Sequence, residues 1–63
     1  MIDFAKKIKE YRMIKFLTQE DLAALLGVAP TTVVRWEKGQ YEPTMKVKKI
    51  LHQLFLEANM DLN

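Results

Sequence analysis

Cysteine is absent from this 63-residue chain, so neither a disulfide nor a thiolate metal site can stabilise it. The only histidine, His52, has no partner for a metal constellation, and we expect no metal site and no cofactor. No apolar run approaches the roughly 18 residues that a membrane span needs, and the N-terminus lacks the apolar core of a signal peptide. We therefore expect a cytoplasmic protein.

No segment alternates apolar and polar residues with period two, so we expect no strands. The chain has only two glycines and two prolines. No set of nucleophile and base stands out, so we do not expect an enzyme. A chain of this length forms one small domain, which buries only about 60% of its unfolded surface. The net charge of +2 and the pI near 9.0 favour an anionic partner, though weakly.

What the sequence does contain is four amphipathic segments, which predict an all-α bundle. We expect helices at about residues 4–15, 18–26, 30–38 and 44–57 within a domain of residues 1–58, followed by a frayed tail at 59–63. The last segment is predicted as one long helix, and a division into a fourth and a fifth helix is the alternative. Asp3 and Thr18 are suited to cap the first two helices, and Pro30 is suited to open the third.

Apolar residues at helical spacing give each segment an inward face. The predicted inward positions are Ala5, Ile8, Tyr11 and Arg12, then Leu22, Ala23, Leu25 and Leu26, then Val33 and Trp36, and finally Val47, Ile50, Leu51, Leu54 and Ala58.

The stretch LLGVAP, residues 25–30, separates two helices that are each too short to be stable alone. Gly27 is suited to the left-handed conformation that ends a helix, and Pro30 starts the next helix three residues later. Ala23 is small enough to let the two helices cross closely. Two short helices joined in this way predict a helix-turn-helix.

The segment LTQEDLAALLGVAPTTVVRWEKGQYEP, Leu17 to Pro43, closely resembles the lambda-repressor-like, Cro-type helix-turn-helix (XRE) family of DNA-binding regulators. The resemblance implies a compact all-α domain whose third helix enters the major groove of double-stranded DNA. It also implies a salt bridge between Arg12 and Glu37, which joins the first and third helices.

Four outward positions of the third helix are the predicted base contacts: Pro30, Thr31, Thr32 and Arg35. Arg35 can make a bidentate contact to guanine, which contributes about 1–3 kcal/mol of discrimination. The threonines offer hydroxyl and methyl groups, and Pro30 only an apolar surface. The alternative is that the threonines merely occupy the first turn and that Arg35 is a solvated charge.

Gln19, Lys38 and Tyr41 are the predicted phosphate contacts. Gln19 matches the phosphate-binding glutamine of the family at the start of the second helix, where backbone N–H groups add partial positive charge. Lys38 and Tyr41 lie at and after the end of the third helix. Each of the three has the alternative of an exposed residue that only covers the edge of the domain.

Five positions depart from the family pattern, and two of them are Lys48 and Lys49, which replace residues that are usually apolar in the fourth helix. Phe16 stands where relatives often end the first helix with Gly or Asn, and we expect an aromatic side chain to pack that turn. Val34 is apolar on a face that is often polar, and it can touch a thymine methyl, a partner chain or nothing. Ala29 is a poor N-cap for the third helix.

The sequence therefore predicts a DNA-binding transcriptional regulator, and a repressor rather than an activator. We expect a homodimer, at least on DNA, because one such domain buries limited area and regulators gain affinity by pairing on two half-sites. The candidate dimer contacts are Phe55, Leu56, Met60 and Leu62, although part of this set must close the core and a frayed apolar tail is the alternative. A protein-interaction or antitoxin-like module of the same fold is the alternative function, and no small-molecule ligand is expected.

Overall fold

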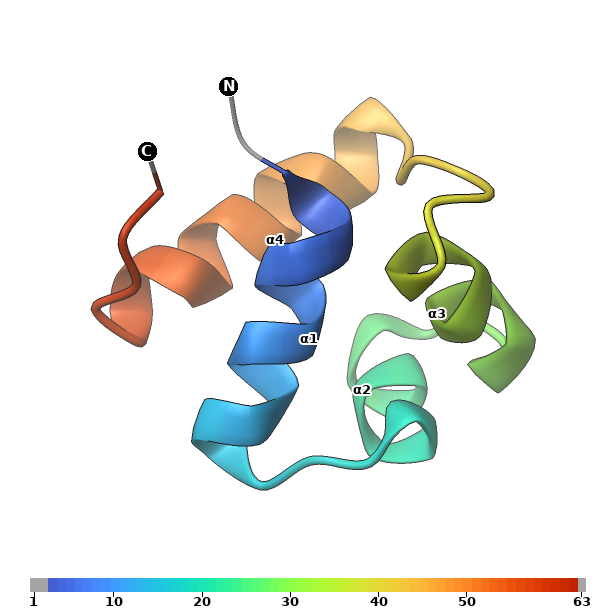
Figure 1. Ribbon diagram of the computed structural model, residues 1–63, viewed down its shortest axis with the longest axis horizontal. Helices are drawn as coiled ribbons and strands as arrows, with labels where there is room; N and C mark the ends of the chain where they lie inside the picture. Colours follow the sequence, from blue (N-terminus) through green and yellow to red (C-terminus); the bar gives the residue numbers. More distant parts are fainter. Residues whose placement is uncertain (1–2, 63) are drawn as a thin grey trace.

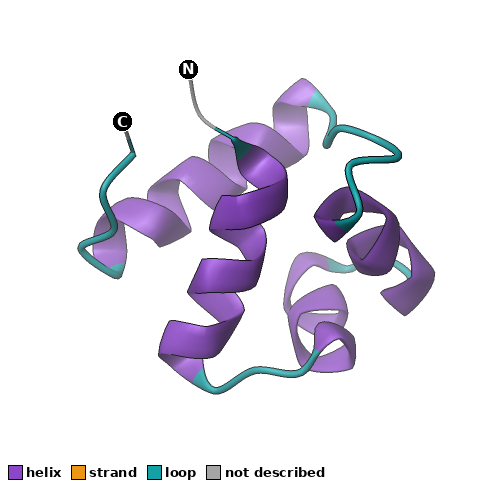
Figure 2. Ribbon diagram, viewed as in Figure 1, coloured by secondary structure: helices purple, strands orange, loops and turns teal. Residues whose placement is uncertain are grey.

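The computed structural model describes residues 3–62, which fold into four helices without a strand (Figures 1 and 2). The helices are α1 (Phe4–Lys15), α2 (Gln19–Leu26), α3 (Pro30–Glu37) and α4 (Met45–Glu57). The predicted all-α fold is confirmed, and each helix begins and ends within one residue of the expected position. The last segment is a single helix.

Side chains cap three of the four helices at their N-termini. The side chains of Asp3 and Thr44 each accept a hydrogen bond from the backbone N–H three residues further on. Thr18 and Asp21 form a reciprocal capping box at the start of α2. Ala29 provides no side-chain cap for α3, which instead has Pro30 in its first turn.

Helix α1 lies in the middle of the molecule, between α4 on one side and the α2–α3 pair on the other (Figure 1). Phe55 of α4 packs against two aromatic rings of α1, at 6.1 Å from Phe4 and 5.9 Å from Tyr11 between ring centroids. The buried core draws on every helix and on the segment after α4, and its members are Ile8, Tyr11, Leu22, Ala23, Val33, Trp36, Leu51, Phe55 and Met60.

Two residues assigned to inward faces are instead largely exposed. Leu25 of α2 is 57% exposed and Ile50 of α4 is 43% exposed. Both lie at the edge of the apolar stripe of their helix, where a short helix in a small domain has no neighbour to cover them.

The expectation for Phe16 is wrong, because its side chain is 92% exposed and does not pack the turn. Its backbone adopts the left-handed conformation, with φ of 57°, and thereby ends α1. Phe16 therefore adopts the conformation in which Gly or Asn is usually found. It ends the helix through its backbone and not through packing of its side chain.

The expectation of a frayed tail is wrong for Met60 and Leu62. Asn59 turns the chain with a φ of 57°, the Met60 N–H donates to the carbonyl of Phe55 at 3.0 Å, and Met60 is buried. Leu62 is partly buried against the same core. Apolar residues after the last helix thus complete a core that four short helices leave open. Asn63 lies outside the described residues.

Candidate nucleic-acid interface

Helices α2 and α3 form the helix-turn-helix expected from the sequence. Gly27 ends α2 in the left-handed conformation with a φ of 72°, and the Val28 N–H returns to the carbonyl of Ala23 at 2.9 Å. Ala23 is only 1% exposed, as expected for a small residue where two helices approach closely. Because the turn after Leu26 is so short, α3 has a fixed direction relative to α2.

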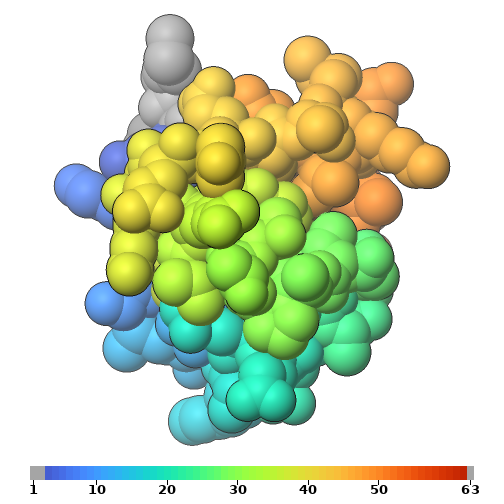
Figure 3. All heavy atoms as spheres, turned by 90° about the vertical axis from the view of Figure 1, so that its right-hand side faces the viewer, coloured from blue at the N-terminus to red at the C-terminus, as the bar shows by residue number. Residues whose placement is uncertain are grey.

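One face of α3 is fixed in the core and the other is free to meet a ligand. Val33 and Trp36 are 0% and 5% exposed. On the outer side, three of the four predicted base contacts are exposed and Thr32 is partly buried; the exposed three are Pro30, Thr31 and Arg35. In Figure 3, α3 fills the middle of one molecular face, with the loop after it above and residues of α2 below.

The predicted ion pair between α1 and α3 is confirmed. Arg12 Nε lies 2.6 Å from Glu37 Oε2, and Arg12 Nη2 donates to Oε1 at 2.9 Å. Arg12 Nη1 also donates to the carbonyl of Leu17 at 3.1 Å. The hydrogen bond to Glu37 raises the pKa of Arg12, which further secures its positive charge. This guanidinium is therefore occupied within the fold and faces α3 rather than a ligand.

Gln19 joins the same cluster, which the sequence did not predict. Its amide Nε2 donates to Glu37 Oε1 at 3.2 Å. Glu37 thus holds the first residue of α2 against the last residue of α3. An amide nitrogen carries two hydrogens, so this bond leaves one for another acceptor.

Arg35 and Tyr41 also lie together, although the sequence assigned them to different tasks. The Arg35 guanidinium carbon lies over the Tyr41 ring at 5.3 Å from its centroid. Both side chains are exposed, and Tyr41 retains 58% of its accessible surface. Lys38 is the C-cap residue of α3 and is also exposed. These residues extend the outer side of α3 into the following loop.

The helix-turn-helix family pattern matches residues 8–55 of this sequence. The chain belongs to the helix-turn-helix family. The resemblance noted from Leu17 to Pro43 is thereby confirmed at the level of the family, which is not a family of enzymes. No solved structure gives a significant match.

Several relatives carry the name HTH-type transcriptional regulator. One from Methanocaldococcus jannaschii is 51% identical over 41 residues, which are 65% of this chain and 62% of the relative. Another, from Archaeoglobus fulgidus, is 41% identical over 49 residues, covering 78% of this chain and 69% of the relative. The HTH-type transcriptional activator BcrR of Enterococcus faecalis is 37% identical over 54 residues, covering 86% of this chain but 26% of its own length. The chain therefore spans less than two thirds of some of these relatives.

A shallow groove runs between the start of α2 and the outer side of α3 in this helix-turn-helix. Its lining residues are Thr18, Gln19, Glu20, Pro30, Thr31 and Val34. Val34 is partly buried and contributes an apolar part of the lining beside three predicted contact residues, which are Gln19, Pro30 and Thr31. The groove joins the N-terminus of α2 and the outer side of α3 into one continuous surface.

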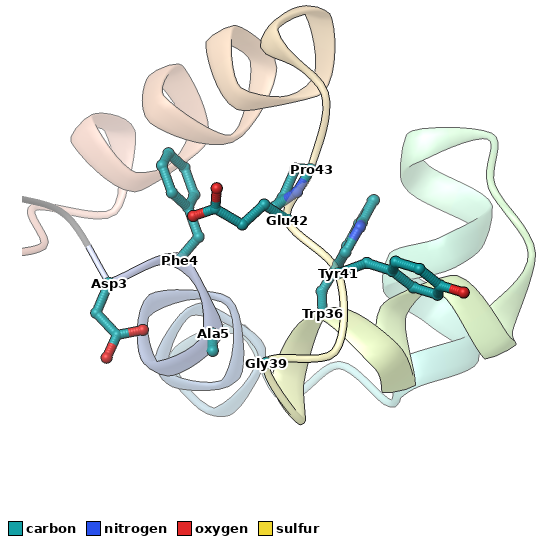
Figure 4. Close-up of a pocket in the computed structure, with 8 residues that line it drawn as sticks. All are labelled: Asp3, Phe4, Ala5, Trp36, Gly39, Tyr41, Glu42 and Pro43. Atoms are coloured by element: carbon teal, nitrogen blue, oxygen red, sulfur yellow. The ribbon is translucent and has the colours of Figure 1, made fainter.

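A second hollow lies between the start of α1 and the loop after α3, and Figure 4 shows the residues around it. In that view Glu42 points toward Phe4, whereas Tyr41 points the other way, along α3. Lys48 Nζ lies 3.7 Å from Glu42 Oε2 and 5.2 Å from the centroid of the Phe4 ring. Lys48 of α4 thus pairs with Glu42 and lies over the Phe4 ring. These contacts connect the loop that carries Tyr41 to α4 and to the start of α1.

No helix in residues 3–62 has the length and apolar character required to cross a membrane.

Proposed function

We propose that this chain is a sequence-specific DNA-binding transcriptional regulator that places α3 in the major groove. The observation that carries the proposal is the two-sided character of α3, which is fixed in the core through Val33 and Trp36 and presents polar side chains outward. Major-groove readout requires a helix whose inner face is packed in the core and whose polar outer face is exposed. The names of the archaeal relatives support the same function.

Arg35 is proposed to read guanine, because its guanidinium is exposed and forms no ion pair shorter than 4.0 Å with residues 3–62. Five N–H donors then remain for the O6 and N7 atoms of guanine. Thr31 and Thr32 are proposed to contact the neighbouring bases through hydroxyl and methyl groups. Pro30 supplies an apolar contact at the first turn.

Gln19 and Lys38 are proposed to fix the register on the phosphates. Glu37 orients the Gln19 amide at the α2 N-terminus, where the helix dipole and the backbone N–H groups favour an anion. Lys38 is an exposed charge at the far end of α3. Tyr41 was predicted to make a third phosphate contact, and this stays a prediction.

A second copy of the chain is the proposed partner on DNA. Of the four predicted dimer contacts, Phe55 and Met60 are buried in the core and Leu62 is partly buried there, which leaves Leu56 at 49% exposure. We therefore place the contact on the outer face of α4, where the exposed residues at helical spacing are Lys49, Ile50, Gln53, Leu56 and Glu57. With so little apolar surface, the dimer is expected to assemble on DNA.

Repression is the proposed outcome of binding, because a domain seated in a promoter excludes polymerase without any further contact. The expected place of action is the cytoplasm, where bacterial and archaeal DNA lies. The Enterococcus faecalis relative is named an activator, so a reporter assay with the operator placed over or upstream of a promoter decides between the two outcomes.

Selection of sites from a random duplex library at about 0.15 M salt tests the proposal. An enriched inverted repeat is expected, whereas a single half-site would retain DNA binding and remove the dimer. Arg35→Ala should relax the preference at one position, and Gln19→Ala should weaken all sequences alike. Lys38→Ala should reduce the slope of the log dissociation constant against log salt concentration by about 1. Lys15→Ala, which removes an exposed charge at the end of α1, is the matched charge control. No enrichment by the parent would favour the protein-interaction module instead.

A further inference from the structure

We propose that Tyr41 is a positioning residue for base recognition, because its ring holds the Arg35 guanidinium in the orientation that meets guanine. This inference rests on the proposed DNA-binding function and assigns the specificity of that site partly to a loop residue. It departs from the phosphate contact that the sequence predicts for Tyr41.

The loop places the Tyr41 ring by backbone contacts that do not depend on DNA. The Gly39 N–H donates to the carbonyl of Trp36 at 3.1 Å, and the Gln40 N–H donates to the carbonyl of Arg35 at 3.0 Å. Gly39 has a φ of 75°, so it takes a left-handed turn that returns the chain along α3. Pro43 is buried and fixes the other end of the loop. The backbone that carries Tyr41 is therefore placed beside α3 before any ligand arrives, and the ring contacts Arg35 there.

The contact with Tyr41 and base recognition can use different parts of the guanidinium. The Arg35 guanidinium carbon lies over the Tyr41 ring at 5.3 Å from its centroid, within the range of cation–π contacts, so the ring meets the cation without taking up its N–H donors. The N–H donors that pair with guanine O6 and N7 lie along the edge of the plane. One side of Arg35 can therefore be held by Tyr41 while its edge reads a base.

An unrestrained arginine would have many rotamers to lose on binding, and holding the side chain in one of them reduces that loss. The restraint acts only where Arg35 makes its bidentate contact. Tyr41 should therefore change discrimination between sequences more than affinity for DNA in general. A phosphate contact from its hydroxyl would do the opposite.

The test compares Tyr41→Leu, which removes the ring, with Tyr41→Phe, which removes only the hydroxyl. Each variant is titrated with the selected site and with a duplex changed at the base pair whose preference Arg35→Ala relaxes. Tyr41→Leu should lower the ratio of the two dissociation constants about two- to five-fold, the strength expected of an exposed cation–π contact. Tyr41→Phe should keep the ratio of the parent. Affinity for a random duplex and its salt slope should not change in either variant.

A double-mutant cycle separates positioning from a general structural effect. In the Arg35→Ala background, Tyr41→Leu should leave the ratio unchanged, and its unfolding midpoint should equal that of Arg35→Ala alone. Equal weakening of all duplexes by Tyr41→Phe would overturn the inference in favour of a phosphate contact. An unchanged ratio in Tyr41→Leu would overturn it while leaving DNA binding intact. A parent that binds no duplex would overturn the proposed function as well.

Discussion

The geometry of the candidate interface depends most on Glu37, through its carboxylate. Its two oxygens accept hydrogen bonds from Arg12 of α1 and from Gln19 of α2, while Glu37 itself ends α3. The side chain is 7% exposed, and that of Arg12 is 16% exposed. Three helices are thereby joined at one point next to the proposed phosphate contact.

Removal of Glu37 alone should destabilise the fold more than removal of both charges. Glu37→Ala leaves the Arg12 guanidinium without its counter-charge in a mostly buried place, a loss of about 3 kcal/mol of unfolding free energy. Arg12→Ala/Glu37→Ala should lose less than Glu37→Ala alone, and therefore less than the sum of the two single variants. Urea unfolding followed by the fluorescence of Trp36, the only tryptophan, measures each value.

The control is the pair Lys7–Glu10, at 3.6 Å on α1, in which the Glu10 side chain is 47% exposed. Glu10→Ala should cost at most about 0.5 kcal/mol, because solvent screens the exposed carboxylate of this pair. Additive losses in the Arg12 and Glu37 cycle would show that the buried pair has no coupling and would contradict the prediction.

Phe16 combines a left-handed backbone with a side chain exposed by 92%, so the folded domain gains almost nothing from its ring. Phe16→Gly should raise the free energy of unfolding by about 0.5–1 kcal/mol, because the strain of a bulky residue at positive φ exceeds the entropy that glycine adds to the unfolded chain. Thermal unfolding monitored by circular dichroism gives the shift.

Gly27 provides the control for the opposite substitution, since it has a φ of 72° and no atom within 4 Å of the position that a β-carbon would take. Gly27→Ala should lose about 1 kcal/mol through backbone strain alone. If Phe16→Gly is instead destabilised, the ring must make a contact that its exposure does not indicate.

At the scale of the elements, α2 is short and depends on its N-terminal capping box. Thr18 Oγ1 accepts from the Asp21 N–H at 3.0 Å, and an Asp21 carboxylate oxygen accepts from the Thr18 N–H at 3.0 Å. The hydrogen bond from the Thr18 backbone N–H, with a smaller contribution from the Thr18 side chain, holds the pKa of Asp21 below its ordinary value. The ionised carboxylate is therefore the form that caps the helix.

A lowered pKa in the folded state implies stability that is present above the unfolded value, about 3.9, and is lost as the pH falls through the folded value. Asp21→Asn should therefore be less stable than the parent at neutral pH, and the difference should shrink as the pH falls through the folded value. Glu20→Gln, which removes a charge in the same turn but outside the capping box, is the matched control. A difference that persists at low pH would mean that charge plays no part in the cap.

The helices were predictable because their signals are local. Thr18, Gly27 and Pro30 specify ends and starts through their own conformational preferences, and Val33 and Trp36 follow from helical spacing. Contacts made across loops carry no such signal. The Gln19–Glu37 hydrogen bond and the Arg35–Tyr41 stack each join residues whose proximity depends on the packed fold, and Met60 lies beyond the last periodic segment.

At the scale of the whole molecule, the outer face of α4 is the surface that we propose for a second copy, with Ile50 at 43% and Leu56 at 49% exposure. An antiparallel two-fold contact centred on Gln53 would bring Ile50 against Leu56 of the other copy. The same register would set Lys49 against Glu57, since both pairs are symmetric about residue 53. Apolar and charged positions are thus complementary in one arrangement, which the proposed dimer requires.

Charge reversal tests this arrangement in the assembled complex. Lys49→Glu and Glu57→Lys each place like charges opposite one another twice per dimer, and each should weaken binding to the inverted repeat by about 1 kcal/mol relative to a single half-site. The combined variant Lys49→Glu/Glu57→Lys should recover the ratio of the parent, because opposite charges then face each other again. Fluorescence anisotropy with full-site and half-site duplexes provides both constants, and the half-site corrects for the changed net charge. A combined variant no better than either single one would place the two-fold contact on another face of the molecule.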